Sequence, residues 1–295
     1  MKRRGFVLFL IFLGLSLVAL PFLREQPIQP AMNRIKVPPA LPMPSTKSSD
    51  LRQKKVEPLK VFHPEPTQTY ADAVFFEVDE NLAIFYDDII LGTLKNADGI
   101  LSGVTIPERP QLWDLPISYA IAKTLADPQR VEAAIQYFNE NTPVKFVPLV
   151  ENEDGIVFVE SEKHCRSYLG KHGSLQPIYL SPQCGPNEII HELMHALGFI
   201  HEQSRTDRDS YVEILWNNIE PQQRGQFQKV PDLLMEAMNG SDFDFNSIML
   251  YRPDIFAKKS GLPTMKSKSN DHINPSRNGL SPVDLARLER LYGPR

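Results

Sequence analysis

The chain has 295 residues and a formal net charge of −4, with 42% hydrophobic and 23% charged residues. These values are ordinary for a folded protein and exclude both a wholly disordered chain and a polytopic membrane protein. The charge is uneven, because residues 1–60 hold 11 Lys or Arg and 3 Asp or Glu, whereas the remaining 235 residues hold 21 and 33. An acidic body lacks the clustered basic residues that neutralise phosphates, so we expect no nucleic-acid partner.

An export signal is predicted at the N-terminus. Three basic residues at positions 2–4 precede an uncharged, apolar run over residues 5–23. This run is typical of either a cleaved signal peptide or a signal anchor, because a membrane-spanning helix needs about 20 apolar residues. We expect residues 1–23 to send the rest of the chain across a membrane, so that the protein is secreted or stays anchored through residues 5–23.

A spacer precedes the body of the protein. Ten prolines lie in Pro21–Pro66, and proline fixes the backbone and removes hydrogen-bond donors. We therefore expect residues 24–66 to form an extended linker. Two β-like runs, Phe75–Val78 and Leu82–Phe85, follow it.

The order of the remaining elements predicts the fold class. In chain order they are a helix over 128–140, strands at Val144–Val150, Ile156–Val159 and Pro177–Leu180, a helix over Asn187–Leu197, and a last helix that opens at Ser281 with Leu285, Leu288 and Leu291 on one face. Asp127 is a plausible N-cap of the first helix, and Gly198 ends the second. This order indicates an α+β fold rather than alternating βαβ units.

The chemistry is concentrated in the second of these helices. His191 and His195 lie four residues apart and therefore share one face, where two imidazoles can bind the same ion. Glu192 is rotated by roughly 100° from His191, so it can act as a general base on a metal-bound water. Gly198 lets the chain turn, which brings His201 back as a third ligand. Catalytic zinc takes three protein ligands and keeps one position open, so zinc is the predicted metal.

This spacing is far from random. Chance produces an HExxH pattern in about one chain in a hundred of this composition, and the added glycine and histidine lower that frequency roughly a thousandfold. The alternative is a helix with three incidental histidines.

The two cysteines carry a separate prediction. Cys165 and Cys184 do not form a CxxC motif, so a cysteine zinc site is excluded. Behind an export signal a disulfide between them is the default, and the alternative is two free buried thiols.

From His191 to Tyr211 the chain reads HELMHALGFIHEQSRTDRDSY, which resembles the astacin family of metzincin zinc endopeptidases. Glu202, directly after the third histidine, distinguishes this family within its clan. Ser247–Tyr251, reading SIMLY, is similar to the family's Met-turn, although the residues on either side of the tyrosine differ from the usual ones. The resemblance covers residues 104–295, the expected catalytic domain.

The resemblance implies a two-lobed metzincin fold, with a twisted N-terminal sheet and the active-site helix in one lobe. The other lobe is mostly irregular and ends in a helix. One zinc per chain would be bound by His191, His195 and His201. Peptide bonds would be hydrolysed by a water that Glu192 activates, while Tyr251 serves as an extra ligand that swings away and donates to the oxyanion.

Two supporting residues and the disulfide follow from the same resemblance. Met249 is expected to lie beneath the zinc ligands. The N-terminus freed by activation is expected near Glu202, and the Cys165–Cys184 pair matches one of the family's two bridges.

A zymogen is also implied. Residues 67–103 would form a propeptide-like segment in which Phe85-Tyr86-Asp87-Asp88 matches the family's Phe-x-Gly-Asp motif, with Asp87 in place of the glycine. Asp88 would then be a zinc ligand, since a carboxylate oxygen can occupy the position of the catalytic water. The alternative is a charged turn. Cleavage near Gly99–Gly103 would free the catalytic domain.

The expected partners are protein or peptide substrates. A substrate would lie extended along an edge strand near Gln176–Leu180 and add a strand by main-chain hydrogen bonds. One competing interpretation is a zinc-stabilised adhesin without turnover, against which Glu192 argues. The other is a metzincin outside the astacins, against which Glu202 and Tyr251 argue.

Overall fold

A computed structural model describes residues 77–79, 82–93, 96–97, 100–101, 109–150, 153–173, 175–269 and 271–294. All of them belong to one structural unit. The predicted export signal, the proline-rich linker and the expected cleavage site at Gly99–Gly103 lie wholly or partly outside these residues. Among the helices of the described part, none has the length and apolar character needed to cross a membrane.

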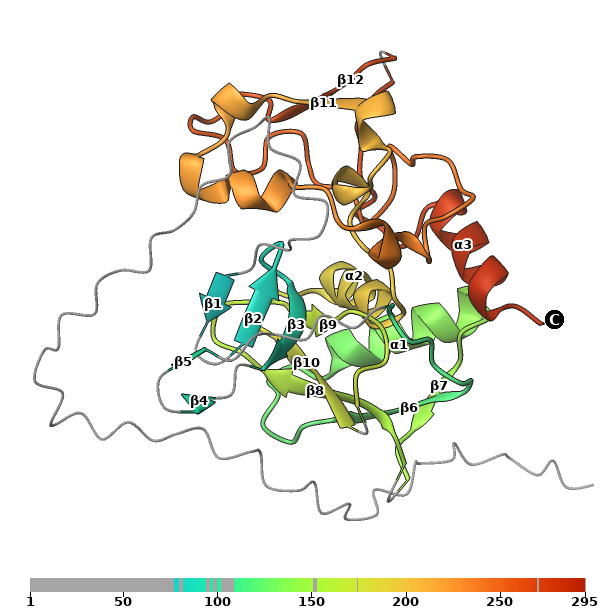
Figure 1. Cartoon of the computed structure of the whole chain (residues 1–295). Coiled ribbons are helices and arrows are strands. Elements are labelled where there is room, and N and C mark those ends of the chain that lie inside the picture. Colours follow the sequence, from blue (N-terminus) through green and yellow to red (C-terminus); the bar gives the residue numbers. More distant parts are fainter. Residues whose placement is uncertain are drawn as a thin grey trace, which may run out of the picture. The chain divides into compact units, whose positions relative to one another are not determined.

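The main sheet has four parallel strands in the order β10-β8-β6-β7 (Figure 1). They are β6 (Ile117–Ile121), β7 (Phe146–Pro148), β8 (Gly155–Glu160) and β10 (Leu175–Leu180). The sequence predicts strands at the positions of β7, β8 and β10, but it does not predict β6. The helix α1 (Gln129–Asn141) joins the parallel strands β6 and β7. The α+β class is confirmed, yet the sheet contains one βαβ unit that the sequence does not predict.

Two helices pack together beside this sheet (Figure 1). The expected helix over 128–140 is α1, but Asp127 does not cap it: the N-cap is Pro128, and Asp127 has a positive φ of 51°. The expected metal-binding helix is α2 (Pro186–Ala196), which begins after Gly185. Both helices bury their apolar residues in the main core together with residues of all four sheet strands.

A second sheet joins an N-terminal hairpin to the body. Its order is β1-β2-β3-β9, formed by β1 (Glu77–Asp79), β2 (Leu82–Phe85), β3 (Ile89–Thr93) and β9 (Ser167–Tyr168). The β2 strand matches its prediction, β1 overlaps the end of the expected run, and β3 is not predicted. Residues 82–93 are called here the N-terminal hairpin. The hairpin extends the body by β-strand addition, because its strand β3 pairs with β9 in parallel.

The part of the body that follows α2 is mostly irregular, as expected. Its elements are η1 (Glu202–Ser204), η2 (Arg208–Ser210), β11 (Val212–Ile214), η3 (Trp216–Asn218), η4 (Pro221–Phe227), η5 (Asp232–Met235), β12 (Met265–Ser267) and α3 (Pro282–Tyr292); a short ladder of β4 (Asn96–Ala97) and β5 (Ile100–Leu101) precedes the body. Ser281 and Asp284 form a reciprocal capping box at the start of α3. A separate hydrophobic core lies in this part, which agrees with the expected second lobe.

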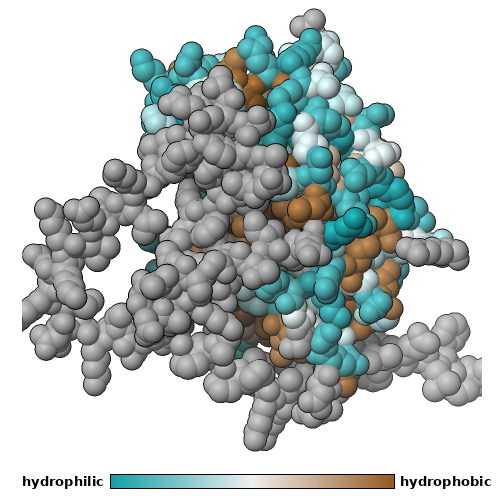
Figure 2. Space-filling view, in the orientation of Figure 1, coloured by the Kyte–Doolittle hydropathy of each residue, from teal (hydrophilic) through white to brown (hydrophobic). Residues whose placement is uncertain are grey.

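The surface mixes hydrophilic residues with scattered apolar patches (Figure 2). Five large apolar residues of the described part are at least 37% exposed, namely Leu112, Leu115, Val150, Leu175 and Leu233. Isolated exposed apolar residues are normal for a folded protein, because polar atoms cannot cover its whole surface.

Candidate metal centre

The helix α2 and the turn after it position the metal-binding motif. Glu188 in the first turn accepts a hydrogen bond from the Gly185 N–H, which helps to start the helix. The helix ends before Gly198, whose φ of +99° is a conformation that glycine adopts without strain. This turn returns the chain so that His201 faces the two histidines of the helix.

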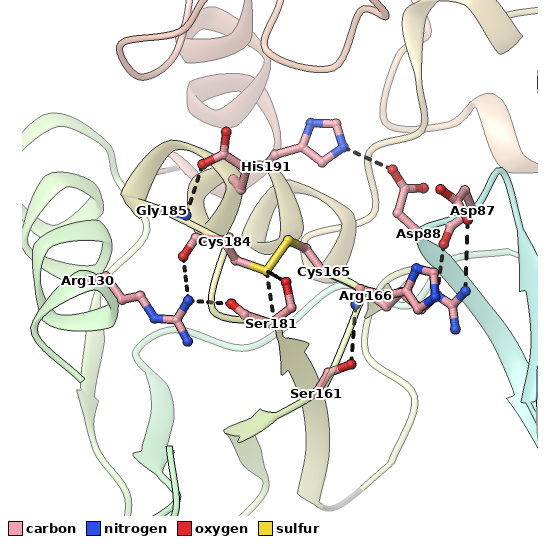
Figure 3. The surroundings of a disulfide bond; sticks show 12 residues. Asp87, Asp88, Arg130, Ser161, Cys165, Arg166, Ser181, Cys184, Gly185 and His191 are labelled. Carbon is pink, nitrogen blue, oxygen red and sulfur yellow. Dashed lines mark hydrogen bonds and ion pairs between the residues drawn. A yellow bond between two sulfur atoms is a disulfide. The ribbon is translucent and has the colours of Figure 1, made fainter. Parts of the chain in front are cut away.

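Four side chains converge on one point. Asp88 Oδ2 lies 3.4 Å from His191 Nε2 and 3.1 Å from His201 Nε2, and Asp88 Oδ1 lies 3.7 Å from His195 Nε2. All four ligand atoms lie within 4.8 Å of one another. These separations are close to the distance between two ligand atoms in a tetrahedral zinc site, which is roughly 3.3 Å for Zn–N bonds of about 2.0 Å. Figure 3 shows Asp88 and His191 directed toward each other.

Hydrogen bonds on the far side of two rings orient their nitrogens for a metal. His191 Nδ1 lies 2.8 Å from the Ile248 carbonyl oxygen, and His195 Nδ1 lies 2.7 Å from that of Phe199. A carbonyl only accepts, so both Nδ1 atoms carry the proton and both Nε2 atoms present lone pairs. His195 Nε2 and Asp88 Oδ1 are buried without a hydrogen-bond partner in the described part. Lone pairs facing a carboxylate repel it unless a cation lies between them, so this set fits zinc.

The charges of the cluster agree with that fit. Burial lowers the pKa of His195 to about 4 and also lowers the pKa of His201, which keeps both imidazoles neutral near pH 7. Burial would lower the pKa of His191 too, but Asp88 beside it raises that pKa. Burial would raise the pKa of Asp88, but the three histidines lower it well below its usual range. Neutral imidazole and ionised carboxylate are the forms that bind zinc.

The two expected catalytic side chains lie in the same region. Glu192 is 2% exposed, and its Oε2 atom has no hydrogen-bond partner in the part of the chain that the structure describes. Burial and then Asp88 raise the pKa of Glu192 well above its usual value, while Arg166 opposes them. The Tyr251 ring lies 4.7 Å from the His201 ring, and its hydroxyl donates to the Tyr86 carbonyl at 3.0 Å.

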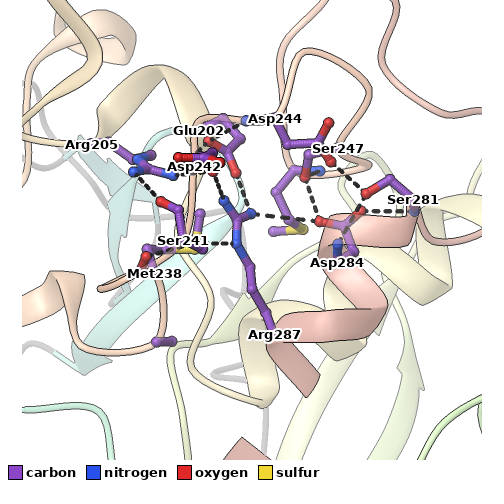
Figure 4. Close-up of polar contacts among 12 residues, drawn as sticks. Glu202, Arg205, Met238, Ser241, Asp242, Asp244, Ser247, Ser281, Asp284 and Arg287 are labelled. Carbon is purple, nitrogen blue, oxygen red and sulfur yellow. Dashed lines mark hydrogen bonds and ion pairs between the residues drawn. The ribbon is translucent and has the colours of Figure 1, made fainter. Parts of the chain in front are cut away.

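A buried ionic network holds the segment that follows the third histidine (Figure 4). Glu202, fully buried, pairs with Arg287 of α3 through one oxygen and with Arg205 at 3.3 Å through the other. Burial raises the pKa of Glu202, and both arginines oppose the shift. The expected approach of a freed N-terminus to Glu202 involves residues outside the described part and stays a prediction. Arg287 is not found by sequence reasoning, because it lies 85 positions from Glu202. Arg205 lies three positions from Glu202, but the sequence does not show that both side chains are buried.

The expected Met-turn is fastened to α3 and to the same segment. The Met249 side chain is fully buried, and its carbonyl accepts from the Glu202 N–H at 2.9 Å. Asp284 accepts from the Ser247 hydroxyl at 2.7 Å and from the Ile248 N–H at 3.0 Å. Asp284 also takes part in the capping box of α3, and sequence reasoning does not reveal its contact with the Met-turn.

The predicted disulfide forms between Cys165 and Cys184, with an S–S distance of 2.05 Å (Figure 3). The buried Arg130 donates to the Cys184 carbonyl at 2.7 Å and reinforces the loop that ends there. Beside the other cysteine, Arg166 donates through Nε to the Asp87 carbonyl at 2.8 Å. Asp87, the competitor of Asp88 in the sequence, therefore faces Arg166 while Asp88 faces the histidines.

The expected substrate edge is partly paired already, although β10 is the edge strand of its sheet. The N–H and carbonyl of Tyr179 in β10 already pair with those of Arg166, at 2.9 and 3.0 Å. The strand that accepts an additional chain is β9, whose Ser167 N–H donates to the Asp88 carbonyl at 2.9 Å. The sequence could not show this, because both segments are short and β-like.

Comparisons with known proteins agree with this geometry. A family model described as Astacin, a peptidase family, matches residues 105–293. Zinc metalloproteinase nas-15 of Caenorhabditis elegans is 37% identical over 68% of this chain, and Meprin A subunit alpha of Rattus norvegicus is 34% identical over 72%. The chain spans only 36% and 28% of the lengths of these two relatives.

A solved structure of a zinc protease is also similar to this chain. The chain resembles High choriolytic enzyme 1, a hatching enzyme zinc-protease from Oryzias latipes, with a TM-score of 0.57 and 33% identity. The match covers 62% of this chain and 95% of the solved one. This chain belongs to the astacin family of peptidases, whose model matches residues 105–293.

Proposed function

We propose that the whole chain is a zinc-dependent endopeptidase, exported as a latent precursor, that hydrolyses extended protein or peptide substrates. The observation that carries this proposal is the convergence of three imidazole Nε2 atoms and Asp88 beside a buried glutamate. The zinc ligands are His191, His195 and His201. Zinc bound there would supply a Lewis acid that polarises the substrate carbonyl and makes water a nucleophile near neutral pH.

The proton transfers fall to Glu192. Its buried carboxylate has a raised pKa and a free oxygen, so it is suited to take a proton from the attacking water. The same group then returns the proton to the leaving amine nitrogen. Tyr251 already donates to a backbone carbonyl, that of Tyr86, and a substrate carbonyl in the same place would receive that hydrogen bond as negative charge develops.

Substrates would bind as an added strand on β9. The N-terminal hairpin supports this interpretation, since β3 already pairs with β9 through Ile89 opposite Ser167 and Ile90 opposite Tyr168. Main-chain pairing requires an extended chain, which favours unfolded segments and exposed loops over small molecules.

Latency would arise from Asp88. Its oxygens lie 3.1–3.7 Å from the three histidine nitrogens, so a metal held there would take the carboxylate as its fourth ligand. Residues 67–103 would then act as the propeptide-like segment, and cutting the chain after the hairpin would release the ligand.

Export is supported by the sequence and by the disulfide. Residues 1–23 would act as signal peptide or membrane anchor and residues 24–66 as a linker. Disulfides persist in oxidising compartments, so the Cys165–Cys184 bond favours a location outside the cytoplasm.

The test uses the full-length chain with a specific-protease site inserted after the N-terminal hairpin. The cut protein should cleave casein and quenched peptides, lose this activity to a zinc chelator, and regain it when zinc is returned. A zinc-loaded, correctly folded protein that cleaves neither substrate would contradict the proposal and favour a zinc-stabilised binding protein.

A further inference from the structure

The Tyr86 side chain is buried beside the metal centre, and the space that it occupies is called here the pocket. Its side chain is 3% exposed, and its backbone has a φ of 54°, which is strained for a residue other than glycine. Such strain persists only where surrounding contacts hold it. The Tyr86 ring lies edge-on to His201 at 5.9 Å, and the Tyr86 carbonyl accepts from the Tyr251 hydroxyl. The buried side chain of Tyr86 therefore holds the residue in place, and its backbone carbonyl lies where we propose that a substrate carbonyl would lie.

The end of the pocket is polar. The Tyr86 hydroxyl donates to the Gln228 carbonyl oxygen. Burial raises the pKa of Tyr86, and Ser204 and Arg208 beside the hydroxyl act to lower it. Ser204 Oγ is buried and has no hydrogen-bond partner in the described part. A carbonyl acceptor next to a spare hydroxyl suits a group that both donates and accepts, as a phenol does.

One wall of the pocket is the Phe85 ring of the hairpin itself, 3.6 Å from the Tyr86 ring, but the polar end of the pocket belongs to the body. Arg208 Nη1 donates to the Gln203 carbonyl at 2.5 Å and to the Phe227 carbonyl. The Val230 N–H donates to the Ser204 carbonyl at 2.8 Å. These bonds join η1 and η2 to η4 and the segment after it, so the polar end of the pocket should keep its shape when the hairpin leaves.

Other side chains fit the pocket less well. The Gln228 carbonyl would repel a carboxylate, and Arg208 already donates to carbonyls of the body and, at 3.2 Å, to Asp209. Phenylalanine could fill the space but would leave the Gln228 carbonyl without its donor, which is costly for a buried group.

We propose that this pocket is a subsite for a tyrosine side chain of the substrate, at a position flanking the scissile bond. Its use in cleavage rests on the proposed function, whereas its binding of tyrosine does not.

The experiment uses the cut full-length protein and quenched peptides in which Tyr, Phe, Leu, Glu or Ala is stepped through the positions around the cleaved bond. At one flanking position kcat/KM for Tyr should exceed that for Phe by about threefold to tenfold, the contribution of one hydrogen bond. The excess of Tyr over Ala should be tens of times, as for burial of an aromatic ring. Ser204→Val, which adds bulk beside the hydroxyl, should remove the excess of Tyr over Phe, measured as the ratio of the two kcat/KM values within the variant. Ser210→Val, at an exposed position in η2, is the matched control.

A binding measurement separates the two proposals. Fluorescence anisotropy of a labelled peptide spanning residues 82–93, either with the natural Tyr86 or with the substitution Tyr86→Phe, is recorded on the cut protein and on its Ser204→Val variant. Tighter binding of the peptide that keeps the tyrosine, lost in Ser204→Val, supports the subsite even if no peptide is cleaved. Equal affinity for both peptides, or a tyrosine preference that survives Ser204→Val, overturns the subsite, as does a preference for Glu in cleavage.

Discussion

Two carboxylates, the half-buried Asp88 and the fully buried Glu202, have different kinds of partner. Asp88 faces the Nε2 atoms of three histidines, and three polar atoms of that cluster, namely Asp88 Oδ1, His195 Nε2 and His201 Nδ1, have no hydrogen-bond partner among the described residues. Glu202 faces two guanidinium groups and the Asp244 N–H at 3.4 Å. The negative charge at Asp88 is compensated only when a cation binds there, whereas arginines of the chain itself compensate the negative charge of Glu202. A carboxylate among neutral histidines thus indicates a ligand site, and a carboxylate between arginines indicates a structural one.

The largest expected effect separates catalysis from stability. Glu192→Gln should lower kcat of the cut protein by about 10²–10⁴, because the general base is lost, while zinc content and unfolding free energy stay close to those of the wild type. Glu188→Gln, an exposed residue of the same helix that can still cap it, is the control. Peptide cleavage at the wild-type rate by a fully zinc-loaded Glu192→Gln protein would refute the base assignment.

The arginine network should show the opposite pattern. Arg287→Met leaves Glu202 buried with one arginine fewer, so the unfolding free energy should fall by about 3–5 kcal/mol in urea titrations. Arg290→Met, one turn on in α3, should cost less, because Arg290 donates to the carbonyls of Asn239 and Ala237 and leaves no buried charge behind. Equal losses for the two variants would mean that Glu202 does not depend on Arg287.

Removal of the metal should act on the histidine site alone. Zinc at a hundred times its Kd should raise the unfolding free energy by about 2.7 kcal/mol, and a chelator should abolish this gain. His195→Ala should remove most of the zinc effect, whereas Arg290→Met should retain it. A zinc-dependent shift that is unchanged in His195→Ala would place the ion elsewhere.

The hairpin ligand should be separable from the rest of the site. In the uncut chain, Asp88→Ala should raise peptide cleavage by about tenfold to a hundredfold, because one charge-assisted contact worth ~1.5–3 kcal/mol is lost. Asp88→Asn should have a smaller effect, since its amide oxygen can still approach the metal. Asp87→Ala tests the neighbouring carboxylate, which faces Arg166. If uncut wild-type and Asp88→Ala chains are both as active as the cut protein, no zinc-blocking switch exists.

The smallest effect concerns pH. Hydrogen bonds from Arg205 lower the pKa of Asp207, so the ionised group stabilises the fold above its unfolded pKa of about 3.9, and this contribution disappears as pH falls through the lower folded value. Asp207 is partly exposed, so the contribution should stay below about 1 kcal/mol. Asp207→Asn should therefore reduce the acid-side slope of unfolding free energy between about pH 5 and about pH 2. Asp254→Asn, which removes an exposed pair with Arg252, is the control. A larger change of the acid-side slope in Asp254→Asn than in Asp207→Asn would argue against a role for the Glu202 network.

Local patterns in the sequence determined the metal-binding helix, the turn at Gly198, the terminal helix, the disulfide pair and the class of the fold. These features depend on residues within one or two turns of each other, or on a single pair of cysteines, so spacing alone can reveal them. Tertiary structure decided the pairing of β3 with β9, the place of β6 in the sheet, the bridge between Tyr179 and Arg166, and the pairing of Arg287 with Glu202. Each of these joins segments that are short or far apart in the chain, as Glu202 and Arg287 are, and their partners are selected by packing of the whole body and leave no periodic trace in the sequence.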